Sequence, residues 1–156
     1  MAGSVFRFHL RFGYHGEGAV CLVDSDSPTL PSEALITAIQ MLEKQGERII
    51  LGPSNDGGYY LIGMKQQHPE VFVDIAWSTS AVLGETMAAV ERIGAELITL
   101  PLWYDVDDAA TLSTLQDELL HHRLPPFASL NGFSVPSTHA FLRRLDLHFN
   151  HLALPS

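Results

Sequence analysis

Two aspartates follow directly on a short apolar run near the start of the chain. The run is AVCLV (residues 19–23), and it leads into VDSDSPTLP (23–31), which contains Asp24 and Asp26. Side chains at positions i and i+2 of an extended segment point to the same side, about 6–7 Å apart, so the two carboxylates can converge. Ligands of open α/β sheets bind at the carboxyl ends of the strands. Paired carboxylates there suit Mg²⁺ or Mn²⁺, and the alternative is a strand-to-helix turn in which Asp or Ser caps the next helix.

A glycine-rich segment, GPSNDGGYYLIG (52–63), carries the second candidate group. Asn-Asp-Gly-Gly is a strong turn signal, and the simplest interpretation is a β-hairpin. Gly57 and Gly58 would also let a ligand approach the backbone closely. Asp56 is the candidate catalytic residue, because it can accept hydrogen bonds from sugar or alcohol hydroxyls or act as a base. We therefore assign substrate binding to Asp56, Gly57, Gly58 and Tyr59.

A third acidic group, YDVDD (104–108), again follows an apparent strand. Asp105 and Asp107 share the i, i+2 relation, and one of them could complete a metal site with Asp26. The alternative is structural, with Asp107 or Asp108 as the N-cap of the next helix. The candidate metal ligands are therefore Asp24, Asp26, Asp105 and Asp107.

Strands and helices alternate along the chain. Apolar runs predict strands at 19–23, 48–51, 59–62 and 96–100. Helices are expected from an N-cap at Thr29 to Gly46, over about 78–93, after the acidic group at 105–108, and briefly around 138–145. This order favours one α/β domain over residues 1–156, with a largely parallel, layered sheet and a C-terminal tail at 124–156.

Composition narrows the classes of function. The formal net charge is −9, with only nine Lys and Arg, so the surface would repel nucleic acid and anionic lipids. An enzyme acting on a nucleotide diphosphate would then need a metal to bridge the charges. No run reaches the roughly 20 apolar residues of a membrane span, and residues 1–15 lack a signal-peptide core, so we expect a cytoplasmic protein. Because Cys21 is the single cysteine, an intrachain disulfide is excluded. We expect the eight His to be surface residues. Trp77 and Trp103 are expected in the core or at its edge.

Together the motifs resemble those of a known family. VDSDSPTLP, LGPSNDGGYYLIG, IAWSTSAVL and WYDVDDAATL occur in the order seen in the radical-SAM/selenodomain-associated transferases, over about residues 19–115. The resemblance implies a Rossmann-like, GT-A-like nucleotide-diphospho-sugar transferase fold, a divalent metal (Mg²⁺ or Mn²⁺), a nucleotide or nucleotide-sugar donor and a small-molecule acceptor. Asp26 matches the family's strand-end metal ligand, whereas Asp24 stands where the family usually has glycine. Asp56, Gly57 and Gly58 match the family's D-G-G, and Asp105 and Asp107 match its D-V-D.

One part of the family pattern is missing. The family begins with a strand and a Gly-rich basic turn, of the kind G-x-x-K-T-R-L, that holds the nucleotide, and nothing upstream of Ala19 matches it. We therefore expect an N-terminally truncated form of the fold, in a fragment, a truncated paralogue or a piece completed by another chain. Alone, it should turn over nucleotide sugars poorly. The competing functions are a non-catalytic domain that binds a ligand or partner, and a haloacid-dehalogenase-type phosphohydrolase with Asp24 as nucleophile.

Residues 1–18 are the candidate for covering the exposed sheet edge. Phe6, Phe8, Leu10 and Phe12 alternate with Arg7, His9 and Arg11, which is the period-2 pattern of a half-buried strand. An uncovered strand offers unpaired N–H and C=O groups that favour association. The sequence predicts a substitute edge strand here, within a homodimer.

Overall fold

The computed structural model describes residues 10–12 and 19–152, and the side chains of residues 19–145. Its elements are five strands, β1 (Leu10–Phe12), β2 (Ala19–Val23), β3 (Arg48–Pro53), β4 (Tyr59–Met64) and β5 (Glu96–Thr99), with the helices α1 (Ser32–Glu43), η1 (Pro69–Phe72), α2 (Val82–Arg92), α3 (Ala109–His121) and α4 (Pro136–Leu152). In the part of the chain that is described, no helix is long and apolar enough to cross a membrane.

The strands form one mixed sheet in the order β1-β2-β4-β3-β5. β3 and β5 are parallel, whereas β4 lies antiparallel between β2 and β3. β2, β3 and β5 therefore point the same way. The prediction of a largely parallel sheet is wrong at β4, because residues 54–58 are too few for the crossover that parallel neighbours need and form a hairpin instead.

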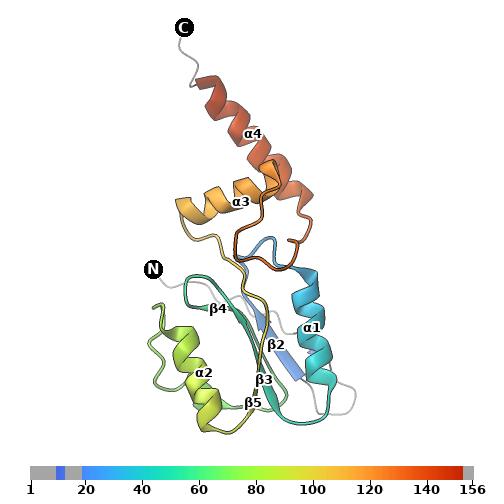
Figure 1. Ribbon diagram of the computed structural model, residues 1–156, viewed down its shortest axis with the longest axis vertical. Helices are drawn as coiled ribbons and strands as arrows, with labels where there is room; N and C mark the ends of the chain where they lie inside the picture. The colour runs from blue at the N-terminus through green and yellow to red at the C-terminus, as the bar shows by residue number, and fades with distance from the viewer. Residues whose placement is uncertain (1–9, 13–18, 153–156) are drawn as a thin grey trace.

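Helices cover both faces of this sheet (Figure 1). On one side α1 packs its buried residues Ala34, Ala38 and Leu42 in a cluster with Ile50 and Leu61 of the sheet. On the other side α2 and η1 pack in a second cluster with the sheet residues Ile49, Leu51 and Ile62. Alternate residues of β3 thus enter opposite cores, which explains its continuous apolar sequence.

The C-terminal third stands above the end of the sheet. Figure 1 shows α3 crossing over that end and α4 leading away from it. The connection from β5 to α3 carries the acidic group at 105–108, and Trp103 and Tyr104 in it are buried. This connection therefore joins the sheet to the helical end of the molecule.

Several element boundaries differ from the sequence expectations. Thr29 is not an N-cap, because α1 begins after Pro31 without a side-chain cap and Thr29 is buried. α2 starts at Val82, four residues later than expected, and α4 extends over 136–152 rather than 138–145. Trp103 is in the core as predicted, and Trp77, which is 50% exposed, stacks at the edge of the core on Phe72.

The sheet edge beside β2 is occupied by β1. Leu10 pairs with Cys21 and Phe12 pairs with Ala19 in an antiparallel register. Residues 10–12 therefore extend the sheet beyond β2, where the sequence predicted a substitute strand. The remainder of that predicted strand, residues 1–9 and 13–18, lies outside the described residues.

Candidate functional site

The three acidic motifs meet at one end of the sheet. They follow β2, β3 and β5, which point the same way, so their carboxyl ends lie together. Backbone hydrogen bonds join the loops: Val106 N donates to Asp26 O over 2.9 Å, and Asn55 N donates to Trp103 O over 3.0 Å. Ser54 and Trp103 also form an isolated parallel bridge. The backbone thus holds the three loops side by side.

Asp24 is half-buried at the end of β2. Its N–H donates to Tyr60 O over 2.9 Å, which continues the β2–β4 ladder, and its Oδ2 accepts from Ser27 Oγ over 2.8 Å. Its Oδ1 is buried and has no hydrogen-bond partner. The pKa of Asp24 is raised to about 7, chiefly by burial. The hydrogen bond from Ser27 lowers this pKa, whereas the nearby carboxylates of Asp26 and Asp105 raise it. Among the residues whose side chains are described, no Lys, Arg or His forms an ion pair with the Asp24 carboxyl.

Asp105 and Asp107 approach from the β5 side. Asp105 is half-buried, and its Oδ1 accepts a hydrogen bond from Ser54 Oγ over 2.8 Å. Asp107 is exposed, but partial loss of solvent and then the charges of Asp105, Asp26 and Asp56 raise its pKa. The same repulsion that raises the pKa values of Asp24 and Asp107 attracts a cation.

The third acidic residue of the 105–108 group has a structural role. Asp108 is the N-cap of α3: its Oδ1 accepts from Thr111 N over 2.8 Å, and Thr111 Oγ1 accepts from Asp108 N over 3.1 Å. This reciprocal pair is a capping box. The hydrogen bonds from Thr111 lower the pKa of Asp108, and the N-cap prediction is confirmed at this residue.

The Asn-Asp-Gly-Gly turn closes the β3–β4 hairpin. Asp56 is exposed, and its Oδ1 accepts from Gly58 N over 2.7 Å. Gly57 has φ +94°, and a Cβ there would collide with the backbone of Ser80 in the loop before α2. Gly57 thus has a structural reason to be glycine, whereas a Cβ at Gly58 would approach only the Asp56 side chain. Their contact with a ligand stays a prediction, while Asp56 points its carboxylate into the turn beside the acidic loops.

Two tyrosines after this turn face opposite cores. Tyr59 is half-buried against the cluster on the α2 side, and burial raises its pKa. Tyr60 is buried on the α1 side, and its hydroxyl donates to Pro101 O over 2.8 Å. Gly52 makes room for the Tyr60 ring, which a Cβ would strike. The Tyr59 side chain thus packs against the core, and its predicted role in substrate binding is untested.

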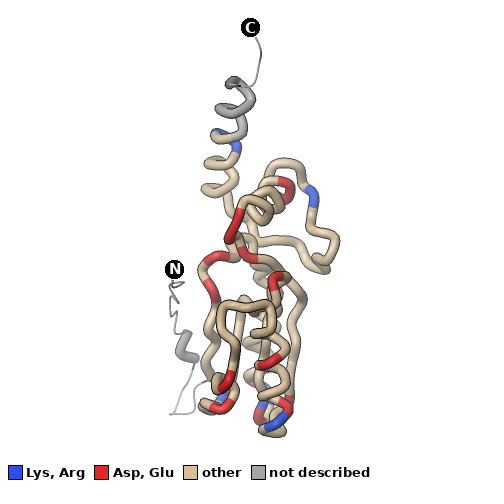
Figure 2. The backbone as a smooth tube through the Cα atoms, turned by 90° about the vertical axis from the view of Figure 1, so that its left-hand side faces the viewer, with Lys and Arg blue, Asp and Glu red and all other residues tan. Residues whose placement is uncertain are grey.

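The oxygen atoms at this end of the sheet are of the chemical type that a hard divalent cation prefers. It offers carboxylate oxygens, one of them the buried and unpartnered Asp24 Oδ1. Figure 2 shows Lys and Arg segments only towards the two ends of the described part of the molecule, whereas acidic segments lie both in its middle and at its lower end. Among the described residues, however, no three His, Cys, Asp or Glu side chains are grouped closely enough to hold a metal. Further ligands would have to be water or substrate oxygens, as is usual for Mg²⁺.

Sequence reasoning missed the serines that fix these carboxylates. Ser27 and Ser54 are both buried, and each donates to one aspartate of the site. A small hydroxyl residue within a few positions of a buried strand's end is the signal that would have found them. They position Asp24 and Asp105 without supplying charge.

Comparisons with known proteins show what the chain is similar to in sequence and in fold. Residues 5–79 match the family described as an uncharacterised protein conserved in bacteria (DUF2064). The chain is also similar to the crystal structure of a candidate nucleotide-diphospho-sugar transferase from Desulfovibrio desulfuricans, with 33% sequence identity and a TM-score of 0.66. That match covers 83% of this chain and 52% of the other, so the chain spans about half the length of the similar structure. No curated protein gives a significant match. The fold is that of a Rossmann-like, GT-A-type nucleotide-diphospho-sugar transferase.

Proposed function

We propose that the chain acts as a metal-dependent transferase on a nucleotide-activated donor, moving a glycosyl or nucleotidyl group to a small-molecule acceptor. The observation that carries this proposal is the convergence of three acidic loops at the carboxyl ends of β2, β3 and β5, with Asp24 Oδ1 buried and unpaired among them. The similarity to a candidate nucleotide-diphospho-sugar transferase supports the same class of donor. The radical-SAM/selenodomain-associated transferase family, which the motifs resemble, is part of this proposal.

In this proposal the protein ligands of Mg²⁺ or Mn²⁺ come from the set Asp24, Asp26, Asp105 and Asp107, and water or substrate oxygens complete the coordination. When bound, such a metal neutralises the charge that develops on the leaving phosphate. Ser27 keeps the Asp24 carboxylate turned towards the site by donating to its Oδ2.

Asp56 is the proposed group on the acceptor side. The hydrogen bond from Gly58 N uses its Oδ1. None of the described residues donates a hydrogen bond to its Oδ2. We propose that this exposed oxygen contacts a hydroxyl of the acceptor. It removes the proton of that hydroxyl as the hydroxyl oxygen forms its bond to the transferred group.

The test is calorimetric titration of the whole chain with Mn²⁺, followed by a panel of nucleotides and nucleotide sugars, and a turnover assay with the ligands that bind. We expect a nucleotide to bind only with Mn²⁺ present, and turnover to be slow. Asp56→Asn should lower the rate without weakening donor binding, whereas Glu91→Gln on the exposed face of α2, with the same change of charge, should alter neither. Nucleotide binding that ignores Mn²⁺ and chelator would overturn the proposal.

A non-catalytic ligand-binding domain is the second candidate. It is favoured by the structural use of three acidic residues: serines hold Asp24 and Asp105, and Asp108 caps α3. Metal-dependent nucleotide binding with no turnover would identify this function. A phosphohydrolase with Asp24 as nucleophile is less favoured, because a pKa of about 7 lowers the fraction of the ionised form. Phosphatase activity lost in Asp24→Asn would identify it.

Assembly belongs to the proposal as well. β1 is at the sheet edge beside β2, and an edge strand offers unpaired backbone groups to a second copy. We propose a homodimer, and light scattering that gives a monomer at micromolar concentration would refute it.

A further inference from the structure

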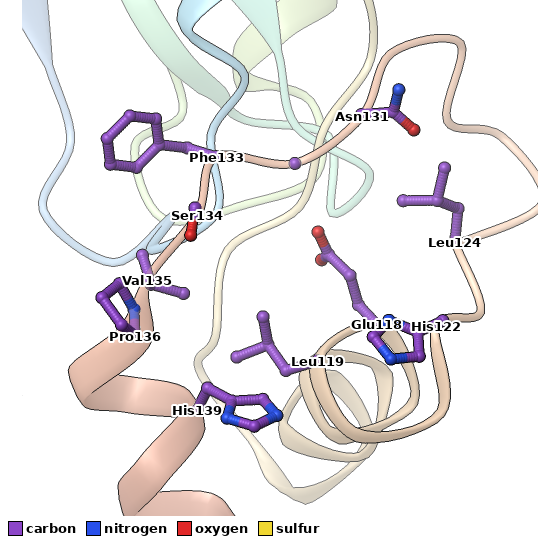
Figure 3. Close-up of a pocket in the computed structure, with 11 residues that line it drawn as sticks. Glu118, Leu119, His122, Leu124, Asn131, Phe133, Ser134, Val135, Pro136 and His139 are labelled. Atoms are coloured by element: carbon purple, nitrogen blue, oxygen red, sulfur yellow. The ribbon is translucent and has the colours of Figure 1, made fainter.

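A separate cavity lies at the helical end of the molecule. It opens between α3, the start of α4 and the segment 124–135, and its volume is about 480 Å³ (Figure 3). This size is within the range of sites that bind small molecules. Much of the lining is apolar and comes from Leu119, Leu124, Phe133 and Val135. The cavity therefore offers an apolar surface against which the apolar part of a ligand can pack.

A carboxylate, that of Glu118, stands in the wall of this cavity. Only 8% of Glu118 is exposed. Its Oε2 accepts hydrogen bonds from Thr29 Oγ1 over 2.9 Å and from the Tyr104 hydroxyl over 2.5 Å. None of the described residues donates a hydrogen bond to its Oε1. In Figure 3 the carboxylate extends from α3 towards the segment 131–133.

That segment is shaped around the carboxylate. A Cβ at Gly132 would collide with Glu118 Oε1, so a larger residue cannot stand there while the carboxylate keeps its place. Phe133 N donates to Thr29 O over 2.9 Å, which ties the segment to the loop after β2. These hydrogen bonds hold the Glu118 carboxylate and the opposite wall next to each other.

The cavity gives Glu118 no counter-charge. Its lining contains two imidazoles, of His122 and His139, but no Lys or Arg. Arg123, the next cation along the chain, is paired with Asp117 over 2.5 Å. Buried charges in proteins are ordinarily paired, and an unpaired one is costly.

The hydrogen bonds from Thr29 and Tyr104 do not explain why residue 118 is a glutamate. Thr29 and Tyr104 both donate to Oε2, and a glutamine carbonyl could accept the same two hydrogen bonds. The negative charge of Glu118 is thus not needed to join α3 to these residues. It is explained if a cation occupies the cavity.

We propose that this cavity binds a small molecule that carries a protonated amine on an apolar body. The ammonium group pairs with Glu118 Oε1, and the apolar part packs against Leu119, Leu124 and Phe133. This site uses none of the proposed metal ligands. The inference is independent of the transferase proposal.

The test compares benzylammonium with benzyl alcohol, which has nearly the same shape but no charge. Both are titrated into the full chain by calorimetry, without metal. We expect benzylammonium to bind at least about tenfold more tightly, because a charge-assisted hydrogen bond to a nearly buried carboxylate contributes more than a neutral one. Equal affinities, or no binding of the amine, would overturn the proposal.

Three variants locate the site. Glu118→Gln should remove the preference for the amine, whereas Glu91→Gln, with the same change of charge on an exposed face of α2, should keep it. Ser134→Trp, at an exposed position in the cavity lining, should weaken both ligands and leave the buried network intact. A preference that survives in Glu118→Gln contradicts the assignment. If Glu118→Gln does not fold, undiminished amine binding in Ser134→Trp contradicts it instead.

Discussion

The two ends of the sheet treat buried charge in opposite ways. At the amino end of β3, Arg48 is only 7% exposed and donates to Glu96 Oε2 over 2.9 Å, Met41 O over 2.6 Å and Gln45 O over 2.7 Å. At the carboxyl end of β2, Asp24 keeps one buried oxygen without a partner. Arg48, whose charge stabilises the fold, has partners for its donors. The unpartnered oxygen of Asp24 instead marks the end of the sheet that is available to a ligand.

Removing Arg48 should cause the largest loss of stability. Arg48→Met keeps much of the apolar stem but leaves two carbonyls near the end of α1 without their donor. We expect the free energy of unfolding to fall by about 3 kcal/mol and the melting temperature by roughly 6–12 °C. Urea denaturation measures the first quantity. A loss below about 1 kcal/mol would mean that the pairing at this end contributes little, and the comparison would fail.

Gly57→Ala tests the rigid turn at the opposite end. The residue has φ +94°, and the new Cβ would meet the backbone of Ser80, so we expect a loss of about 2 kcal/mol in urea denaturation. Gly84 provides the control, because it is in α2 and a Cβ added there would have nothing within 4 Å. Gly84→Ala should stabilise by about 0.5–1 kcal/mol through helix propensity. Equal effects of the two variants would show that the turn is not constrained.

Asp24→Asn should make the protein more stable, in contrast to Arg48→Met. The pKa of Asp24 is raised to about 7 in the folded chain, from 3.8, so the folded state holds this proton more tightly than the unfolded state. The contribution of Asp24 to stability is therefore greatest below pH 4 and is lost as the pH rises to 7. Asparagine should stabilise the protein by about 1–2 kcal/mol at pH 8, after allowance for solvent screening, and by much less near pH 5.

Melting temperatures at pH 5 and pH 8 check this prediction. Glu91→Gln is the control for the change in net charge and should shift the melting temperature little at either pH. A destabilised Asp24→Asn at pH 8 would indicate that the carboxylate serves the fold, as Arg48 does.

The sequence predicted the acidic end of the sheet better than it predicted the sheet itself. The apolar run before Asp24 and Asp26 identified a strand end, because that signal is local. The direction of β4 is wrong in the sequence prediction because alternating strands and helices outweigh the hairpin signal of the Asn-Asp-Gly-Gly turn. The cap predicted at Thr29 is wrong because the actual partner of this residue, Glu118, is 89 residues away, and no local pattern reports such a contact.

Asp26→Asn should have the smallest effect on stability, and it separates the fold from the proposed metal site. The side chain is exposed, and the contact that Asp26 makes with the neighbouring loop is through its backbone oxygen, which accepts from Val106 N over 2.9 Å. The substitution keeps that hydrogen bond, so the melting temperature should change by less than about 1–2 °C. Mn²⁺ affinity should nevertheless fall at least about tenfold in calorimetry, because one carboxylate ligand is lost. Unchanged Mn²⁺ affinity with an unchanged melting temperature would remove Asp26 from the ligand set, and a large drop in melting temperature would instead place Asp26 with the residues that hold the fold.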